Sequence, residues 1–425
     1  MKIHKVAILG LGYIGLPTFV AIAKTKLYKV VGYDTDSKKI NFIKHGMSPI
    51  EDEEVKNYLK KKSPDVSDDE KILENSDVFI ICVPTPVYND YTPNYSYIEN
   101  AVKTIAKFIQ SGSHVVLEST VNPGTCQEII APLLAKHCSL KLGKDYNLSH
   151  CPERINPGDK KWNIYNINRN IGSIDQKFNK KIADFYKSFI TNAAVNQVSS
   201  LEVAEASKII ENAYRDINIA FVNELAKSFD AQGIDLDETI KAASNKPFSF
   251  MPHWPGCGVG GHCIGVVPNY LIERARKNGF NHSFLKLARE INNSMPEYTV
   301  QRLILGLNDI GLSVKKRKIT LLGLTYKPDL KDTRESPATE IRKKLMELGA
   351  NLKTYDPFVK SDYKSLKDSL KDAECLVIAT AHSEFVNMLP SALLKTKVKL
   401  VVDGRNCLDK TLVEKYKIIY KGIGR

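Results

Sequence analysis

Short apolar runs alternate with longer amphipathic stretches in the first part of the chain. Each run ends in polar or turn residues, and the stretches between runs are long enough for helices. This alternation predicts a parallel sheet with helices on both faces, in which the polar strand ends share one edge. The runs lie at residues 5–9, 28–34, 77–86, 114–124 and 146–158.

A different pattern starts near Leu201, where "LEVAEASKIIENAYRDINIAFVNELAKSFDAQG" predicts one long helix closed by Gly233. Lys208, Asn212 and Arg215 recur at the spacing that places an amine, an amide and a guanidinium on one helix face. A solvated face is the alternative. Apolar residues instead favour burial of the helix between domains: Ile209, Ala213, Ile217, Ala220 and Phe221.

A second α/β pattern follows, with strands expected at residues 318–322, 351–355, 375–379 and 399–402. It has no GxGxxG sequence, so we expect it to bind something other than a dinucleotide bound in the same way. Lys327 and Arg334 are candidate phosphate ligands there. The fold class expected is α/β, with two Rossmann-like doubly wound domains joined by a long central helix. The expected domains are 1–198, 199–312 and 313–425.

Composition narrows the function classes. The 425 residues carry a formal net charge of +13, but lysines are dispersed among acids, which favours a solvated surface and a polyanionic small ligand over nucleic acid. No apolar run is long enough to span a membrane, and the first residues lack the order of a signal peptide, so a cytoplasmic protein is expected. The eight cysteines form no CxxC pairs and predict neither disulfides nor a metal site. Cys257 and His262 raise a metal alternative, but no further ligands converge on them in sequence.

The opening "KVAILGLGYIGLP" has the arrangement of a dinucleotide-binding turn. A strand precedes Gly10, Gly12 and Gly15, a helix follows them, and Asp34 ends the next strand. The glycines permit a tight turn, close approach of backbone to a pyrophosphate and packing of the helix on the sheet. The acid suits the free ribose hydroxyls of NAD better than the 2′-phosphate of NADP. A glycine turn without a nucleotide is the alternative.

Three later strands also end in polar residues. Thr85, Thr120 and Glu153 follow runs whose ends should meet at one sheet edge, and they are candidates for a cofactor and substrate crevice. Capping of strand ends is the alternative for each residue alone.

The stretch "WPGCGVGGHCIGVVPNYL" surrounds Cys263 with glycines. Glycine backbone can approach a substrate closely, and free amides can hold an oxyanion. A thiol in such a place can add to an aldehyde, release a hydride from the thiohemiacetal to NAD⁺, and leave a thioester for hydrolysis. A loop with a structural cysteine is the alternative.

Seven ordered motifs resemble the UDP-glucose/GDP-mannose dehydrogenase family across nearly the whole chain. They are "GLGYIGLP", "VPTP", "EST", "CPERINPG", "EASKIIENAYRDINIAFVNE", "PGCGVGGHCI" and "GLTYKPDLKDTRESPA". "CPERINPGDKK" is most similar to the UDP-N-acetylhexosamine 6-dehydrogenases of surface-polysaccharide synthesis. The resemblance implies an NAD-binding domain, a central region that forms a homodimer, and a C-terminal domain that binds a UDP-sugar.

The family's roles are carried over to matching positions. The resemblance implies that Cys263 is the nucleophile, that Lys208 and Asn212 stabilise oxyanions, and that Glu153 and Thr120 serve the hydrolytic water. The NAD-binding residues that it implies are Gly10, Gly12, Tyr13, Ile14, Gly15, Asp34, Lys39, Pro84, Thr85, Thr120 and Arg334. The sugar-nucleotide ligands that it implies are Arg154, Ile155, Lys208, Asn212, Arg215, Tyr326 and Lys327.

One position departs from the family pattern. Members usually carry an Asp four residues after the thiol, which helps to organise the Lys and the water, and here Val267 stands there. A valine neither accepts a proton nor orders water. Either another acid compensates, or hydrolysis is slow, or turnover is lost.

The expected function is therefore the four-electron oxidation of C6 of a UDP-N-acetylhexosamine by NAD⁺, with UDP-N-acetylglucosamine as the first candidate. UDP-N-acetylmannosamine and UDP-glucose are alternative substrates. Two other classes stay open: a sugar-nucleotide-binding pseudoenzyme, and a two-electron dehydrogenase of the 3-hydroxyacid type that has no need of Cys263.

Overall fold

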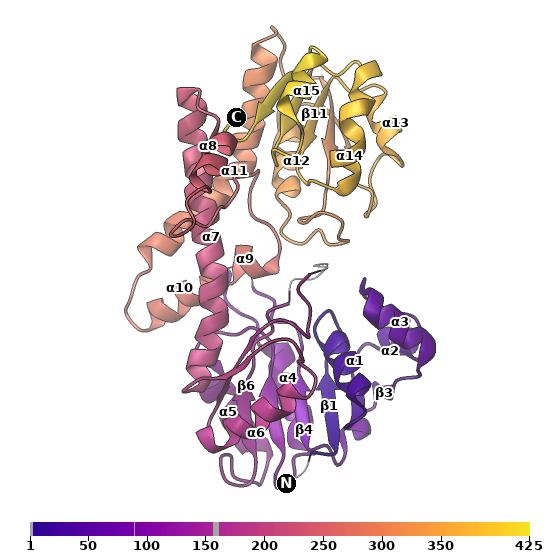
Figure 1. The fold of residues 1–425 in the computed structure, drawn as a ribbon, viewed down its shortest axis with the longest axis vertical. Helices are drawn as coiled ribbons and strands as arrows, with labels where there is room; N and C mark the ends of the chain where they lie inside the picture. The colour runs from indigo at the N-terminus through magenta and orange to yellow at the C-terminus, as the bar shows by residue number, and fades with distance from the viewer. Residues whose placement is uncertain (1–2, 89, 156–160) are drawn as a thin grey trace. The chain divides into compact units, whose positions relative to one another are not determined.

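The computed structural model describes residues 3–88, 90–155 and 161–425. The chain forms two compact units. The N-terminal unit comprises residues 1–211 and 269–279, and the C-terminal unit comprises residues 212–268 and 280–425. Helix α7 (Leu201–Gln232) begins in the first and ends in the second (Figure 1). The helix expected from Leu201 to Gly233 is thus confirmed.

An eight-stranded sheet forms the centre of the N-terminal unit, in the order β3-β2-β1-β4-β5-β6-β7-β8. Neighbouring strands are parallel except β6 and β7. All five predicted strands occur, although the third to fifth end earlier than their apolar runs. The bounds are β1 (Lys5–Leu9), β2 (Lys29–Tyr33), β3 (Val66–Ser67), β4 (Val78–Ile81), β5 (His114–Leu117), β6 (Asn147–His150), β7 (Arg169–Ser173) and β8 (Val195–Gln197).

Helices cover both faces of this sheet. Along β1, Val6 and Ile8 belong to one apolar core while Ala7 and Leu9 belong to another, so successive side chains are buried on opposite faces. The helices are α1 (Gly15–Thr25), α2 (Ser37–Lys44), α3 (Glu53–Lys61), α4 (Ser96–Ala106), α5 (Ala131–His137), α6 (Gln176–Lys187) and α10 (Pro268–Lys277), with a 3₁₀ turn η1 (Glu70–Leu73) and a π-helical turn η2 (Cys126–Ile130).

The C-terminal unit contains a five-stranded parallel sheet in the order β10-β9-β11-β12-β13. Its strands are β9 (Lys318–Leu322), β10 (Asn351–Tyr355), β11 (Cys375–Ile378), β12 (Leu400–Asp403) and β13 (Ile419–Gly422). The first four were predicted, and β12 begins one residue later than expected. The helices are α8 (Leu236–Ala243), α9 (His262–Val266), α11 (Ser283–Asn308), α12 (Pro337–Glu347), α13 (Leu366–Leu370), α14 (Ser383–Ala392) and α15 (Lys410–Lys415), with a 3₁₀ turn η3 (Leu393–Lys395).

Both sheets reverse their strand order at one point, which is where doubly wound sheets bind ligands. The reversal lies between β1 and β4 in the N-terminal unit and between β9 and β11 in the C-terminal unit. The expected α/β fold class, with two Rossmann-like domains and a long central helix, is confirmed. The domain boundaries at 198/199 and 312/313 stay a prediction.

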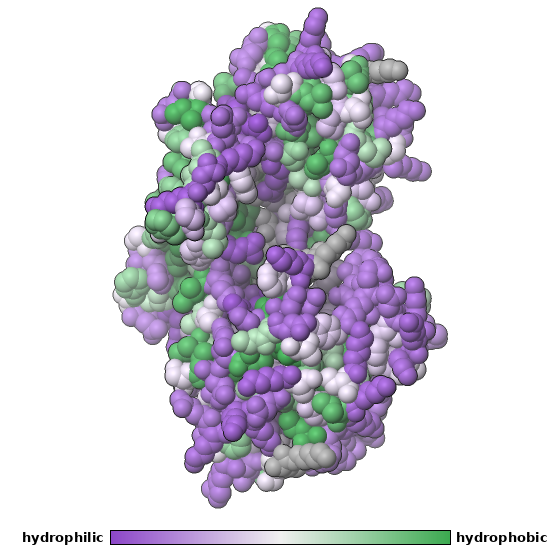
Figure 2. All heavy atoms as spheres, in the orientation of Figure 1, coloured by the Kyte–Doolittle hydropathy of each residue, from purple (hydrophilic) through white to green (hydrophobic). Residues whose placement is uncertain are grey.

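Two surface properties bear on function. On the face shown in Figure 2, hydrophilic residues cover most of the surface, with apolar residues scattered between them. Among the described helices, none is long and apolar enough to cross a membrane.

Candidate active site

The glycine turn follows β1 at the reversal point of the N-terminal sheet. A Cβ on Gly10, whose φ is +90°, would lie 2.8 Å from the carbonyl oxygen of Cys82, and a Cβ on Gly15 would lie 1.9 Å from that of Gly10. These two glycines let the turn close against the end of β4 and the start of α1. Gly12 differs, because nothing lies within 4 Å of the Cβ that it lacks. That open space is what a pyrophosphate needs to approach the backbone.

Asp34 lies beside this turn and is already engaged. Its Oδ2 accepts hydrogen bonds from Leu11 N at 2.8 Å and from the Lys39 ammonium at 2.7 Å, while Oδ1 accepts from Asp36 N at 3.0 Å. The structure thus brings together Asp34, Lys39 and the glycine turn, as expected. The Lys39 ammonium offsets part of the negative charge that the sequence assigned to this place.

The ends of β4 and β5 supply the neighbouring candidates. Pro84 is exposed, Thr85 is buried and Thr120 is half-buried. The Thr85 carbonyl accepts a hydrogen bond from the Tyr270 hydroxyl at 2.9 Å, and the Ser119 hydroxyl donates to the Val83 carbonyl at 2.7 Å. Hydrogen bonds therefore hold both strand ends in place. Tyr13 is exposed and Ile14 is half-buried at the start of α1. That these residues bind NAD stays a prediction.

Glu153 is buried in an ion pair with Arg169, which the sequence reasoning missed. The Arg169 side chain is completely buried and its Nη2 contacts Glu153 Oε2. Glu153 Oε1 accepts hydrogen bonds from Arg154 N, at 2.6 Å, and from Ile155 N. Both carboxylate oxygens are thus held by donors of the protein itself, an arrangement that fixes the orientation of the group.

A second buried carboxyl lies in the same group of side chains. Glu118 accepts a hydrogen bond from the Tyr186 hydroxyl at 2.6 Å. Burial raises the pKa of the Glu118 carboxyl, and the Arg169 charge opposes that rise. Glu118 belongs to the "EST" motif that contains Thr120, and the structure assigns it to the interior behind Glu153 rather than to the crevice.

The predicted sugar-nucleotide ligand Arg154 is paired within the N-terminal unit. Its Nη2 lies 2.6 Å from Glu211 Oε1, its Nε donates to Glu211 Oε2 at 3.2 Å, and its Nη1 donates to the Asn168 carbonyl at 2.8 Å. Ile155 is half-buried. The rest of "CPERINPGDKK", residues 156–160, lies outside the described part of the chain.

Helix α7 carries Lys208 and Asn212 one turn apart. Lys208 is half-buried, whereas Asn212 is 4% exposed and its Nδ2 has no hydrogen-bond partner among the described residues. Arg215 is exposed whereas Asn212 is buried, although the sequence predicted that both lie on one helix face. The buried acid of this face is Asp216, which continues the spacing of four from Lys208 and Asn212.

The packing of the loop that carries Cys263, here called the thiol loop, explains why it contains so many glycines. Cys263 lies at the start of α9 and is the exposed member of the eight free cysteines. Gly261 N donates to the Arg334 carbonyl at 3.2 Å, and a Cβ on Gly261 would lie 2.5 Å from the Tyr326 ring. The loop is therefore glycine-rich because it packs on Tyr326 and on the segment around Arg334. Cys257, the other thiol of the loop, is buried and donates to the Ala379 carbonyl at 3.3 Å.

The segment after β9 holds Tyr326 and Lys327, both half-buried. Asp356 Oδ2 accepts hydrogen bonds from Leu324 N at 2.6 Å, from Thr325 N at 3.1 Å and from His382 Nε2 at 3.0 Å. Burial raises the pKa of Asp356, but the hydrogen bonds to its carboxylate lower it by more, so the pKa is about 2. A fixed carboxylate therefore braces the turn that precedes Tyr326 and Lys327.

Arg334 extends from the segment that contacts the thiol loop. Its guanidinium binds Asp332, with Nη2–Oδ2 at 2.6 Å, and this hydrogen bonding raises the pKa of Arg334. The side chain is exposed. Its expected contact with NAD stays a prediction.

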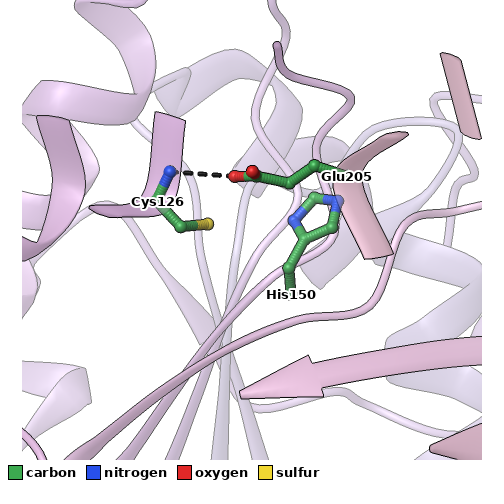
Figure 3. A group of neighbouring side chains, drawn as sticks. All are labelled: Cys126, His150 and Glu205. Carbon is green, nitrogen blue, oxygen red and sulfur yellow. Dashed lines mark hydrogen bonds between the residues drawn. The ribbon is translucent and has the colours of Figure 1, made fainter. Parts of the chain in front are cut away.

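Figure 3 shows a buried group of possible metal ligands in the N-terminal unit. The ligand atoms of Cys126, His150 and Glu205 lie within 4.8 Å of one another. However, Glu205 accepts hydrogen bonds from Gly124 N at 2.5 Å and Cys126 N at 2.8 Å. Burial raises the pKa of Glu205 to about 7 and that of the Cys126 thiol, and it lowers the pKa of His150 to about 3. The Cys126 thiol and the His150 imidazole are therefore favoured in their neutral forms, and Glu205, which accepts from Cys126 N, serves as a cap for the start of η2.

Comparison with known proteins decides the family. Residues 4–190 match the NAD-binding domain of the UDP-glucose/GDP-mannose dehydrogenase family, residues 202–294 its central domain and residues 320–410 its UDP-binding domain. The chain belongs to this family. It is an NAD-dependent oxidoreductase of the UDP-sugar dehydrogenase type, and its C-terminal sheet belongs to the UDP-binding domain.

Individual relatives cover most or all of the chain. The UDP-N-acetyl-D-mannosamine dehydrogenase of Methanococcus vannielii is 36% identical over 438 residues, which covers 100% of this chain and 98% of the relative. The UDP-N-acetyl-D-glucosamine 6-dehydrogenase of Pseudomonas aeruginosa is 34% identical over 91% of this chain and 93% of its own length. The solved UDP-D-ManNAc dehydrogenase of Pyrococcus horikoshii has a TM-score of 0.92 at 35% identity, covering 99% of both chains.

Sequence reasoning missed several residues that hold the candidate site together, including Arg169, Asp356 and His382. Each of them is separated along the chain from the groups that it binds, so only the contacts in the structure reveal them. Asp216 is different, because extending the spacing from Lys208 and Asn212 by one more turn finds it.

Proposed function

We propose that this chain oxidises C6 of a UDP-N-acetylhexosamine to a carboxylate, with Cys263 as the covalent nucleophile and two NAD⁺ consumed per sugar. The observation that carries the proposal is the exposed Cys263 thiol on a loop packed against Tyr326 and the Arg334 backbone. An exposed thiol beside the segment expected to hold the nucleotide is where a covalent acyl carrier is needed.

The steps assign work to residues of this chain. Bound NAD⁺ accepts the hydride in each of the two oxidations. Lys208 takes the C6 hydroxyl proton in the first. Cys263 Sγ then bonds to the aldehyde carbon while the thiol proton passes to the C6 oxygen, and that proton is released in the second oxidation. Lys208 and Asn212 stabilise the charge that develops on the C6 oxygen. After the second oxidation, water adds to the thioester carbon, the C6–S bond breaks, and the electron pair leaves on Sγ.

Glu153 orders the hydrolytic water in this scheme, with Thr120 beside it. Contacts with Arg169 and two backbone amides already engage both oxygens of the Glu153 carboxylate. Such engagement supports orientation of the water, through remaining lone pairs, over abstraction of its proton.

The names of the relatives support an N-acetylated sugar as the substrate. Full-length relatives at 35–36% identity are named for UDP-N-acetylmannosamine, and another at 34% for UDP-N-acetylglucosamine. We therefore propose UDP-N-acetylmannosamine as the first candidate substrate and UDP-N-acetylglucosamine, which the sequence favoured, as the second. The enzyme would serve surface-polysaccharide synthesis.

A homodimer is proposed as the working assembly. Ile210, Tyr214 and Phe221 are exposed on α7 at spacings of four and seven, which makes one apolar stripe. Exposed apolar stripes of this kind mark protein interfaces.

The test is a count of NADH per sugar oxidised, with UDP-N-acetylmannosamine, UDP-N-acetylglucosamine and UDP-glucose supplied separately. Two NADH per sugar and a carboxylate product support the proposal. One NADH would indicate a two-electron dehydrogenase, and none with any of the three sugars would indicate a binding protein without turnover.

A further inference from the structure

Val267 leaves the thiol helix without an acid. The residue follows α9, four positions after Cys263, and its side chain is buried. Glu153 is then the one acid so far assigned to the hydrolytic water, and the second acid that other members carry on this helix has to come from another element.

Asp216 of α7 is a buried acid in the same C-terminal unit, and its two oxygens have different surroundings. Oδ1 accepts hydrogen bonds from Arg289 Nη1 at 2.6 Å and from Asn292 Nδ2 at 2.8 Å. Oδ2 is buried and has no hydrogen-bond partner in the described part of the chain. A buried acceptor without a partner is destabilising, so the arrangement is explained if something else donates to it.

Asn212 provides the complementary group one helical turn earlier. Its Nδ2 is a buried donor that lacks a partner among the described residues. Residues four apart lie on the same helix face with Cβ atoms about 5–6 Å apart. The two side chains make no hydrogen bond to each other here, and one water between them could accept from Asn212 Nδ2 and donate to Asp216 Oδ2.

Arg289 connects this pair to the thiol helix. Its Nη1 binds Asp216, its Nη2 donates to Asn293 Oδ1 at 2.6 Å, and Nη2 would lie 3.9 Å from a Cβ on Gly265. Gly265 is part of α9, two residues after Cys263. The guanidinium that binds the acid therefore lies beside the helix that carries the thiol. Arg289 is also the charged group that the described residues place against Asp216.

We propose that Asp216 holds the hydrolytic water together with Asn212 and so takes the place of the carboxylate that Val267 lacks. The inference rests on the proposed function, since Asn212 must lie at C6 of the sugar. The water donates one hydrogen bond to Asp216 Oδ2 and its oxygen bonds to the acyl carbon. One of its protons returns to Cys263 Sγ as the C–S bond breaks, and the acid product leaves as a carboxylate while the other proton passes to solvent.

Asp216→Asn tests the proposal, because it keeps the side-chain shape and one oxygen for Arg289. We expect the pre-steady-state burst of NADH to persist while steady-state turnover falls at least about tenfold. This lower bound is set below the range of about 10²- to 10⁴-fold for general acid/base catalysis, because Asp216 orders the water and does not take its proton. Mass spectrometry of enzyme quenched during turnover should show an acyl adduct on Cys263. A burst and steady-state rate that fall in parallel would overturn the proposal, as would an unchanged steady-state rate.

Asp230→Asn is the matched control. Asp230 is a half-buried acid of α7 that is paired with an arginine of α11, Arg302, at 3.0 Å. It lies about 20 Å further along the helix, at about 1.5 Å rise per residue. We expect this variant to lower the melting temperature and to leave the ratio of burst to steady-state rate unchanged. If Asp230→Asn changes that ratio as Asp216→Asn does, the effect is structural and the proposal is wrong.

Val267→Asp provides a rescue. In the parent enzyme it should change turnover less than about twofold, because the acid is already supplied; in the Asp216→Asn background it should restore at least about tenfold, the effect of about 1.4 kcal/mol. A large gain in the parent with no rescue in the double variant contradicts the proposal.

Three further outcomes are separated in advance. Where Asp216→Asn does not fold, Asp216→Glu replaces it: the carboxylate is kept but shifted, so steady-state turnover should fall at least about threefold with the burst retained, and an unchanged rate overturns the proposal. Where the parent forms no NADH with any of the three sugars, the proposed function fails and this inference fails with it. Where the parent turns over and the variants match it, only the inference fails.

Discussion

The two sheets of this chain have the same doubly wound topology but present their ligand edges differently. At the reversal point of the N-terminal sheet, the glycine turn leaves open space at Gly12, so the backbone itself is available to a ligand. At the reversal point of the C-terminal sheet, Asp356 and His382 brace the turn that precedes Tyr326 and Lys327. The first edge offers amide groups, whereas the second offers side chains on a fixed turn.

The difference shows why one fold serves two nucleotide ligands in one enzyme. Backbone amides at a helix start suit the pyrophosphate of a dinucleotide. A turn fixed by a buried carboxylate can present an aromatic ring and an ammonium group, which suits a uridine nucleotide with its base and phosphates. Substitutions at one sheet edge should therefore impair binding there and leave binding at the other edge unchanged.

The largest effect is expected from Cys263→Ala, which should remove the chemistry and leave both edges working. Acid formation should fall by about 10⁴-fold or more, since a nucleophile cannot be replaced by its neighbours. Calorimetry should still detect binding of both NAD⁺ and UDP. Cys138→Ser, at a half-buried thiol of the N-terminal unit, is the control and should keep parent activity. Acid formation at the parent rate by Cys263→Ala would show that covalent catalysis at this thiol is wrong.

Gly12→Ala should damage only the N-terminal edge. Because nothing lies within 4 Å of the added Cβ, the melting temperature of the ligand-free protein should not change. NAD⁺ affinity should fall at least about tenfold, or 1.4 kcal/mol, because the methyl group fills the space for the pyrophosphate. UDP affinity should not change. Gly15→Ala is the contrast, since its Cβ would lie 1.9 Å from the Gly10 carbonyl oxygen and should destabilise the fold itself. Unaltered NAD⁺ affinity in Gly12→Ala would contradict the assignment of this turn.

Asp356→Asn should damage only the C-terminal edge. UDP affinity should fall about tenfold, or 1.4 kcal/mol, with NAD⁺ affinity unchanged, because the turn before Tyr326 loses its brace. Asp362→Asn is the control, because Asp362 binds Thr354 rather than the turn. Equal UDP affinity in the parent and Asp356→Asn would show that the brace does not position the ligand residues.

The same residue predicts a pH effect. The folded-state pKa of Asp356 is lowered to about 2, so its contribution to stability is complete above the ordinary aspartate pKa and is lost as pH falls through about 2. Between about pH 4 and pH 2 the free energy of unfolding should therefore decrease by about 2 kcal/mol from this group. Denaturant titrations of the parent and Asp356→Asn at both pH values measure the difference, which should shrink toward acid pH.

The smallest effect concerns cofactor choice at the N-terminal edge. We expect NAD⁺ to be preferred over NADP⁺ by at least about tenfold, because Asp34 repels a 2′-phosphate. Asp34→Asn should reduce this preference, and Lys39→Gln should increase it, since the Lys39 ammonium at 2.7 Å offsets part of the Asp34 charge. The ratio of kcat/KM values for the two cofactors measures both. Equal use of NAD⁺ and NADP⁺ by the parent enzyme would mean that Asp34 does not select the cofactor.

The sequence alone determined the order of the elements and most of the NAD edge. Apolar runs located nine strands, because strands of a parallel sheet that are buried on both faces are mostly apolar. The glycine turn and Asp34 were readable for a similar reason: a tight turn against a pyrophosphate tolerates few residue types, and these residues lie close together in sequence.

Tertiary structure decided which polar groups lie together and which are already engaged. Arg169 lies far along the chain from Glu153, and His382 is separated from Thr325 by two strands, so no periodicity links them. The helix spacing led the sequence analysis to place Arg215 on the face with Lys208 and Asn212. Packing against Arg289 and Asn292 instead buries Asp216, the next residue along the helix. Local sequence sets which face a residue occupies, but burial and pairing depend on elements brought together from distant parts of the chain.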